Sequence, residues 1–341
     1  MEISDHVLTG TEHTSDNASL YLHFPCFDGL VSGALTWEFL KRRGWEFTRV
    51  QPVNYNLRST WLATKLEPPS AVIDFLYHPE AQFWADHHLT TFLTDDLKTE
   101  FNAQPKPWMF YDSAAGSCAS LLWRTVSGSL DSARGRYKEM VDWAEKIDSA
   151  GYASVQEAIL GDAPALRINV SMICGGGLEY CDLLLRAVLD KDLNDVAELP
   201  EVKTRFEKGR ALLLAGLRRF RESARPLEGG IVAFDLDARD DDITSRYAPF
   251  YFFPEARYSI GVIRRKSGAS ITAMRNPWRE FPSVPLGVMF ERVGGGGHQR
   301  VGSVVLGKER STEATGILWQ LISEIRKQDE MKLEPGEPAS A

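Results

Sequence analysis

An aspartate and two histidines, Asp86, His87 and His88, stand together directly after a short apolar run. Imidazole nitrogens and carboxylate oxygens together suit Mn²⁺, Fe²⁺ or Zn²⁺. A tripeptide of this kind also occurs by chance on protein surfaces, so its meaning depends on its neighbours. Other metal-binding side chains that also follow apolar runs would strengthen the case for a metal site.

Four more such side chains lie at or just after other apolar runs: His23, Cys26, Asp28 and Asp74. The runs are bounded by Pro, Gly, Asp or Asn, as β-strands tend to be. They span residues 19–24, 47–53, 71–75, 82–85 and 107–111. The carboxyl ends of parallel strands line one edge of a sheet, where ligands bind. We therefore expect these side chains to converge on one point.

The elements that must hold them alternate between strand and helix. Helical spacing over 30–43 separates the first two runs, and this alternation predicts a mostly parallel α/β sheet. Further helices are expected over 114–125, 135–149, 155–160 and 178–189, and a long amphipathic helix over 202–224. β-rich runs follow at 230–236, 258–264, 269–274 and 303–306, before a closing helix over 312–327.

This pattern predicts two folded domains in 341 residues, a length that exceeds one ordinary domain. The expected parts are a polar N-terminal segment, an α/β domain, a linker helix, a smaller α/β domain and a disordered tail. Their bounds are 1–18, 19–200, 201–228, 229–330 and 331–341.

Composition places the chain among globular proteins, with 43% apolar and 25% charged residues. The four cysteines show no CxxC pairing, which favours free thiols in a reducing compartment. The N-terminus is polar rather than signal-like, and no apolar run approaches the ~18 residues of a membrane span. We therefore expect a cytoplasmic protein with no membrane partner.

Charge is divided unevenly along the chain. The net charge of −8 argues against broad, unspecific nucleic-acid binding. Residues 1–200 carry 16 Lys and Arg against 28 Asp and Glu, whereas residues 201–341 carry 23 against 19. An acidic half that can hold cations, joined to a basic half that can hold anions, suits metal-assisted phosphate chemistry, although ordinary surface variation would give the same division.

Five segments of the sequence, taken in order, resemble the motifs of one known family. They are HFPCFDGLVSGAL (23–35), VIDF (72–75), WADHH (84–88), IDSAGY (147–152) and GGGGHQRVGSVVL (294–306). The first four resemble the successive motifs of the DHH phosphoesterase superfamily, and the last resembles the glycine-rich signature of the DHH-associated C-terminal domain. The family includes RecJ-type exonucleases, nanoRNases, cyclic-dinucleotide phosphodiesterases and inorganic pyrophosphatases.

The resemblance implies a role for each matching residue. The implied metal ligands are His23, Asp28, Asp74, His87 and Asp148, with Asp74 bridging two ions. Asp142 is an alternative to Asp148, because it lies on the same predicted helix. His88 would sit beside the bound phosphate, with Asp86 supporting the histidines. In the second domain the substrate contacts would come from Arg275, Gly295, Gly296, Gly297 and His298.

One position departs from the family's first motif. Cys26 stands where the first of two aspartates is usual, and its spacing from His23 is one residue shorter. The thiol either packs as a small apolar group and weakens one metal position, or binds a softer ion such as Zn²⁺ or Fe²⁺. Of the two, we favour packing from the sequence.

The sequence therefore predicts a metal-dependent phosphoesterase of the DHH type. The expected cofactor is Mn²⁺, as one or two ions, with Zn²⁺, Fe²⁺ or Mg²⁺ as alternatives. The expected substrate is a short oligonucleotide or a small phosphorylated nucleotide, and a homodimer is left open. Two alternatives remain: a polyphosphate or pyrophosphate hydrolase, and a non-catalytic nucleotide-binding protein whose metal site has degenerated.

Overall fold

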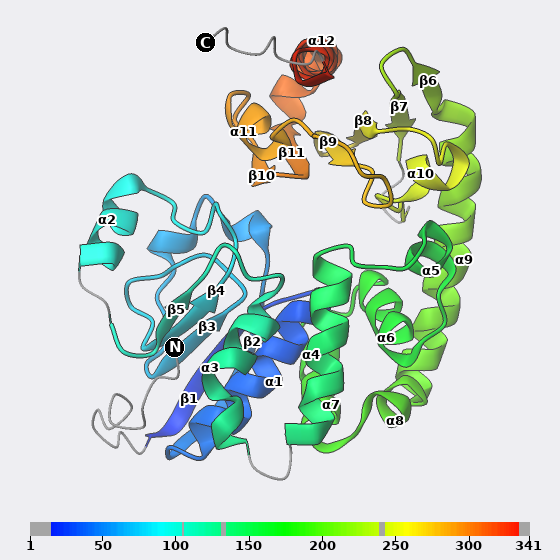
Figure 1. The fold of residues 1–341 in the computed structure, drawn as a ribbon. Coiled ribbons are helices and arrows are strands. Elements are labelled where there is room, and N and C mark those ends of the chain that lie inside the picture. The colour runs from blue at the N-terminus through cyan, green and yellow to red at the C-terminus, as the bar shows by residue number, and fades with distance from the viewer. Residues whose placement is uncertain (1–14, 104–105, 131–133, 239–242, 334–341) are drawn as a thin grey trace, which may run out of the picture. The chain divides into compact units, whose positions relative to one another are not determined.

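The computed structural model describes residues 15–103, 106–130, 134–238 and 243–333. The chain divides into two compact units (Figure 1). The first unit consists of Met1–Tyr152 with Gly161–Gly209, and the second consists of Ala153–Leu160 with Arg210–Ala341. The expected N-terminal segment and C-terminal tail lie almost wholly outside the described residues.

A five-stranded parallel sheet forms the centre of the first unit, with the strand order β2-β1-β3-β4-β5. The strands are β1 (Ser15–His23), β2 (Trp45–Val53), β3 (Ser70–Ile73), β4 (Phe83–Asp86) and β5 (Met109–Tyr111). Strands β3 and β4 are buried along their whole length, as strands covered on both faces must be. The predicted parallel α/β sheet is thus confirmed.

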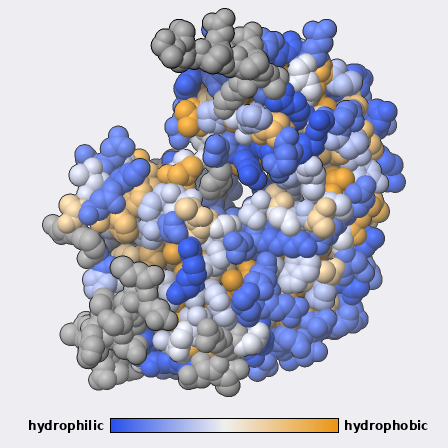
Figure 2. Space-filling view, viewed as in Figure 1, coloured by the Kyte–Doolittle hydropathy of each residue, from blue (hydrophilic) through white to orange (hydrophobic). Residues whose placement is uncertain are grey.

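Helices cover this sheet (Figure 1). Helix α1 (Phe27–Lys41) contacts β1 and packs against three others, which are α3 (Cys118–Val126), α4 (Arg134–Asp148) and α7 (Gly177–Asp190). An aromatic core that includes Trp61, Phe75 and Trp84 lies beside the 3₁₀-helices η2 (Tyr55–Leu57) and η3 (Trp61–Ala63) and helix α2 (Asp95–Ala103). The remaining helices of the unit are η4 (Ser127–Ser129), α6 (Pro164–Ile173) and α8 (Leu193–Ala197). The visible surface over α7 and α8 is mostly hydrophilic (Figure 2).

Helix α3 begins later than the sequence predicted. The expected start was residue 114, but the helix begins at Cys118, because the Ser117 hydroxyl accepts a hydrogen bond from the Ser120 amide and caps it. The preceding residues instead form a loop, in which the Ala114 amide donates to Asp112. The carbonyl of Ala115, in this loop, contacts the His87 ring.

The second unit is built on a six-stranded mixed sheet with the order β10-β11-β9-β8-β7-β6. Only β7 and β8 are parallel; the other pairs are antiparallel. The strands are β6 (Arg225–Leu227), β7 (Ile231–Asp237), β8 (Tyr258–Arg265), β9 (Gly268–Arg275), β10 (Gly296–His298) and β11 (Val301–Gly307). The β-rich second region is confirmed, but the sequence missed β6 and β10, whose proline and glycines are unusual in strands.

The helices of the second unit are α5 (Val155–Leu160), α10 (Ala248–Phe252), α11 (Leu286–Glu291), η6 (Lys308–Glu313) and α12 (Ala314–Leu333). Helices α11 and α12 pack on the sheet through one apolar cluster that includes Phe290, Leu321 and Ile325. Helix α9 (Pro200–Ser223) is divided between the two units. In the described part of the chain, every helix is too short or too polar to cross a membrane.

Candidate metal centre

Metal-binding side chains converge at the carboxyl edge of the parallel sheet. His23 ends β1, Asp74 follows β3, and Asp86 ends β4 immediately before His87 and His88. Cys26 and Asp28 lie at the start of α1, and Asp148 is the last residue of α4. The structure therefore brings together the seven residues that the strand pattern placed at this edge, together with Asp148, which the family resemblance implied.

Two local backbone features position the ligands. Asp74 adopts a left-handed conformation with φ 56°, which is uncommon for a residue other than glycine and turns its side chain as β3 ends. Gly29 lies so close to β1 that a Cβ atom there would come within 2.1 Å of the His23 carbonyl oxygen. The start of α1 is thereby held against the end of β1, so Cys26 and Asp28 stand beside His23.

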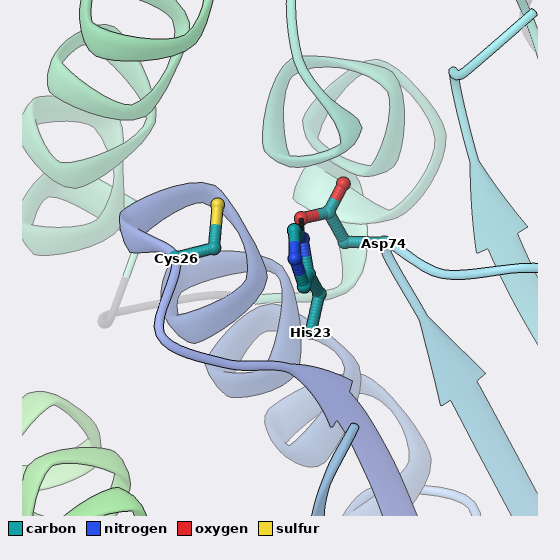
Figure 3. Close-up of side chains that lie close together, drawn as sticks. All are labelled: His23, Cys26 and Asp74. Carbon is teal, nitrogen blue, oxygen red and sulfur yellow. Dashed lines mark hydrogen bonds and ion pairs between the residues drawn. The ribbon is translucent and has the colours of Figure 1, made fainter. Parts of the chain in front are cut away.

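The first group of donors consists of His23, Cys26 and Asp74, whose ligand atoms all lie within 4.8 Å of one another. Figure 3 shows the three side chains approaching from the end of β1, the start of α1 and the residue after β3. His23 Nδ1 lies 3.2 Å from Asp74 Oδ2. This group offers one nitrogen, one sulfur and one oxygen.

The second group consists of Asp28, His87 and Asp148, again within 4.8 Å. His87 Nε2 lies 3.2 Å from Asp148 Oδ2, 3.7 Å from Asp28 Oδ2 and 3.9 Å from Asp74 Oδ1. Its other nitrogen, Nδ1, donates to the Ala115 carbonyl at 3.1 Å. Because a carbonyl only accepts, Nδ1 carries the proton and Nε2 is the atom that can bind a metal.

Asp28 has a second task in the fold. Its oxygens accept hydrogen bonds from the backbone amides of Cys118 and Ala119, at 2.7 and 2.8 Å, and from the Ser32 hydroxyl at 3.1 Å. These amides belong to the first turn of α3, where a carboxylate is favoured. These contacts fix the direction of the Asp28 carboxylate, as hydrogen bonds to the ligating side chains do in metal sites.

Asp86 orients the histidine pair. Its Oδ1 accepts from the backbone amide of His87 at 2.8 Å and contacts His88 Nδ1 at 2.7 Å. Asp86 is fully buried, whereas the His88 side chain is 17% exposed. His88 Nδ1 also lies 3.8 Å from Asp74 Oδ1, so Asp74 forms a third group with both histidines.

The electrostatics of the site call for a cation. Burial, reinforced by neighbouring carboxylates, raises the pKa of Asp74 well above its usual value and raises that of Asp28. Burial opposes the charged form of His87, but its hydrogen bond with Asp148 and the nearby carboxylates raise its pKa to about 9. For His23, burial and the neighbouring His88 lower the pKa to about 4.

The residues fit a divalent metal. Asp74 is 1% exposed, and its Oδ1 makes no hydrogen bond within the described part of the chain, which is costly for a buried oxygen. The charged partners found for Asp28, Asp74 and Asp86 among the described residues are histidines rather than Lys or Arg. A cation shared through Asp74 would satisfy this oxygen and offset the clustered negative charge.

The structure also decides between the two aspartates of α4. Asp148 reaches His87, whereas Asp142 lies on the exposed face and pairs with Lys138 one turn away. The geometry thus agrees with Asp148 as the fourth-motif residue. Asp142 serves as a natural comparison on the same helix.

Arg275 occupies a different environment from the one expected of a substrate arginine. It is 4% exposed, and its guanidinium donates to the carbonyls of Asn276 and Phe281 at 2.9 and 3.2 Å. The guanidinium also lies 4.4 Å from the Phe281 ring centroid. These contacts give Arg275 a structural task in the second unit, and its contact with substrate stays a prediction.

The glycine run has a structural explanation of its own. A Cβ on Gly295 would lie 2.2 Å from the Ser303 carbonyl oxygen, and one on Gly297 would lie 2.3 Å from that of Val301. Gly296 and Gly297 pair with β11 in a short hairpin. Their role at an anion stays a prediction, as does that of His298, whose side chain lies outside the described set.

Sequence reasoning missed Tyr55. It lies in η2 after β2, is 37% exposed, and its ring centroid is 5.1 Å from that of His23 and 5.9 Å from that of His88, both edge-on. The surrounding Asn54-Tyr55-Asn56 carried no strand or motif signal. Only its position after β2, at the same sheet edge, could have pointed to it.

Comparison with solved structures identifies the fold. A pGpG-specific phosphodiesterase, PggH from Vibrio cholerae, matches with a TM-score of 0.65 at 17% identity, covering 92% of this chain and 100% of that one. The DHH domain of a protein described as a member of the s1p family of ribosomal proteins matches with a TM-score of 0.60 at 12% identity, covering 91% and 87%. The chain has the DHH fold.

A RecJ structure with Mn²⁺ from Thermus thermophilus also shares this fold, with a TM-score of 0.56 at 13% identity; the match covers 90% of this chain and 52% of RecJ. No protein-family model and no curated protein sequence matches the chain. The predicted resemblance to DHH proteins is therefore confirmed by structure, where sequence comparison alone finds nothing.

Proposed function

We propose that this DHH-fold protein is a metal-dependent phosphoesterase that hydrolyses short oligonucleotides or small phosphorylated nucleotides. The observation that carries the proposal is a pair of adjacent donor groups, His23 with Cys26 and Asp74, and Asp28 with His87 and Asp148. Asp74 Oδ1 lies 3.9 Å from His87 Nε2 and so links the two groups. Proteins with this fold include a phosphodiesterase and an exonuclease crystallised with Mn²⁺, which supports the same chemistry here.

Divalent ions in such a site lower the pKa of a bound water and offset negative charge on a phosphate. The chain's own residues would prepare the site for them. Ala115 holds the His87 ring so that Nε2 faces the carboxylates. The amides of α3 hold the carboxylate of Asp28 in the same way.

His88 is suited to the substrate phosphate. Burial opposes its charged form, but Asp86 raises its pKa above the usual value of a histidine. A charged, oriented donor that is partly exposed can hold a phosphate oxygen with a charge-assisted hydrogen bond. Asp86 acts through His88 and is a positioning residue.

The substrate class follows from charge. A chain with a net charge of −8 makes a poor partner for long nucleic acids, which reward many phosphate contacts. A di- or oligonucleotide needs few such contacts.

One specific observation favours a second candidate function, hydrolysis of polyphosphate. An exopolyphosphatase-related protein from Bacteroides fragilis shares the fold, with a TM-score of 0.52 at 12% identity.

A substrate screen tests the proposal. Metal-loaded protein is given the linear dinucleotide pGpG, longer single-stranded DNA, a phosphorylated mononucleotide and polyphosphate, and release of products is measured. We expect the dinucleotide or mononucleotide to be cleaved fastest, with loss of activity in Asp74→Ala and after chelation. Preference for polyphosphate would establish the second candidate, and no turnover of any substrate by fully loaded protein would favour a binding protein.

A further inference from the structure

The two halves of the metal centre differ in donor chemistry. The half formed by Asp28, His87 and Asp148 offers carboxylate oxygens and one imidazole, whereas the other half contains the sulfur of Cys26 beside His23. Carboxylate-rich sites suit Mn²⁺ and Mg²⁺, while thiolate favours Zn²⁺ and other soft or borderline ions. Asp74 belongs to the half that contains Cys26, and its Oδ1 lies 3.9 Å from His87 Nε2 in the other half.

We propose that the position framed by His23, Cys26 and Asp74 selects a thiophilic divalent ion, such as Zn²⁺ or Fe²⁺, through Cys26 Sγ. The position framed by Asp28, His87 and Asp148 takes Mn²⁺ or Mg²⁺. The chain would thus hold two different ions side by side. This inference rests on the proposed metal dependence and names which ion each position holds.

The surroundings of Cys26 argue against simple packing. Cysteines that act as small apolar groups are buried in the protein core, as the fully buried Cys181 of α7 is. Cys26 is only half-buried, and its Sγ lies within 4.8 Å of ligand atoms of His23 and Asp74, which stand beside it in Figure 3. It stands at the N-cap of α1 but makes no side-chain capping bond.

A second observation points to a cation at the carboxylate of Asp74, whose Oδ2 lies beside His23 and whose Oδ1 faces His87 and His88. The carboxylate of Asp74 is 1% exposed, and its Oδ1 makes no hydrogen bond among the described residues. A buried oxygen in this state is stabilised by a cation. On these grounds we favour a ligand role for Cys26 over the packing role that the sequence favoured.

Cobalt spectroscopy tests the sulfur ligand without measuring turnover. Metal-free protein is titrated with Co²⁺ under anaerobic conditions, and the thiolate-to-cobalt charge-transfer band is followed in the near ultraviolet. We expect the band in the wild type and in Cys174→Ser, whose half-buried thiol contacts the Arg205 carbonyl away from both donor groups. The band should be absent in Cys26→Ser and Cys26→Asp.

Metal analysis tests which ion each of the two positions selects. Protein loaded with one equivalent of Zn²⁺ per chain and an excess of Mn²⁺, the more weakly binding ion, should retain one ion of each per chain, and Cys26→Asp should shift this content toward Mn²⁺. Circular dichroism checks that each variant is folded. A wild type without the charge-transfer band, or with two Mn²⁺ per chain, would overturn the inference.

The outcomes separate this inference from the proposed function. A protein that shows the band and holds one ion of each kind, yet cleaves no phosphoester, keeps the metal assignment and loses the proposed activity. Hydrolysis by a protein with two Mn²⁺ and no band keeps the activity and refutes the sulfur ligand.

Discussion

In the first unit, Asp28, Asp74 and Asp86 are buried within 4 Å of histidine nitrogens, and one buried oxygen of Asp74 has no hydrogen bond among the described residues. In the second unit, the buried Asn276 is fully paired: its amide donates to the carbonyls of Pro254 and Ala256, and its oxygen accepts from the Trp278 amide. Like charges crowd together in one unit, and complementary groups pair in the other.

The buried Tyr258 and Asp329 of the second unit are paired in the same way. The Tyr258 hydroxyl donates to Asp329 at 2.8 Å and accepts from the Val284 amide, and Arg257 pairs with the same aspartate. Such groups stabilise a fold because every donor has its acceptor. The crowded carboxylates of the first unit fit a cation, and this difference is why we place the proposed metal centre there.

The sharpest test of this comparison uses two aspartates of one helix. Asp148→Asn should lower turnover by about 10³-fold, since loss of a metal ligand removes several kcal/mol of stabilisation of the developing charge. Asp142→Asn is the matched control, because Asp142 is exposed and pairs only with Lys138 among the contacts found for it. We expect that control to retain its activity and metal content, measured by steady-state kinetics and elemental analysis.

Equal loss in the two variants would show that α4 acts through its stability rather than through a ligand. Unchanged metal content in Asp148→Asn would remove Asp148 from the centre.

The strand ends could be predicted from sequence, whereas the choice between these aspartates could not. Asp74 and the 86–88 run follow apolar strands, and parallel pairing brings such positions together whatever the details of packing. Asp142 and Asp148 are six residues apart, which turns a helix by about 240°. Which of them faces the sheet depends on how α4 packs against α1 and α3, and the sequence does not contain that information.

Two further residues have surroundings that the sequence could not predict. Arg275 ends a strand whose alternation is compatible with an exposed tip, but the loop that carries Phe281 folds over it and buries the guanidinium. Tyr55 lies among asparagines in a turn, and only the three-dimensional closeness of η2 to His23 and His88 reveals it. Contacts made by loops are the part of a site that periodicity cannot predict.

The second test asks whether the hydrogen bonds of Arg275 stabilise the second unit. Arg275→Met removes two charged hydrogen bonds to buried carbonyls and should lower the free energy of unfolding by about 1.5–3 kcal/mol. Metal content should stay at the wild-type value, because Arg275 lies in the other unit. Urea unfolding and elemental analysis measure the two quantities.

The opposite result would be equally informative. If Arg275→Met keeps wild-type stability and raises KM without altering metal content, the guanidinium leaves its carbonyl partners to hold the substrate phosphate, as the family resemblance implies.

The third test separates structural from anion-binding glycines. Gly295→Ala would place a Cβ 2.2 Å from the Ser303 carbonyl oxygen and should cost about 1–3 kcal/mol of stability as the hairpin shifts. Gly316→Ala is the control in α12, where a Cβ meets nothing within 4 Å, and it should stabilise the helix by about 0.5–1 kcal/mol. Thermal unfolding measures both changes, and a Gly295→Ala protein of unchanged stability would contradict the packing account.

The smallest effect on turnover is expected at Tyr55, which contributes an aromatic ring rather than a charged group. Tyr55→Leu removes the edge-on contacts with the His23 and His88 rings. A contact between two aromatic rings contributes about 0.5–1.5 kcal/mol. We expect turnover to fall by roughly tenfold, because 1.4 kcal/mol corresponds to a factor of ten. Tyr55→Phe keeps the ring and should stay within about twofold of the wild type. If Tyr55→Phe instead falls as far as Tyr55→Leu, the hydroxyl contacts the substrate, and the first unit recognises substrate as well as metal.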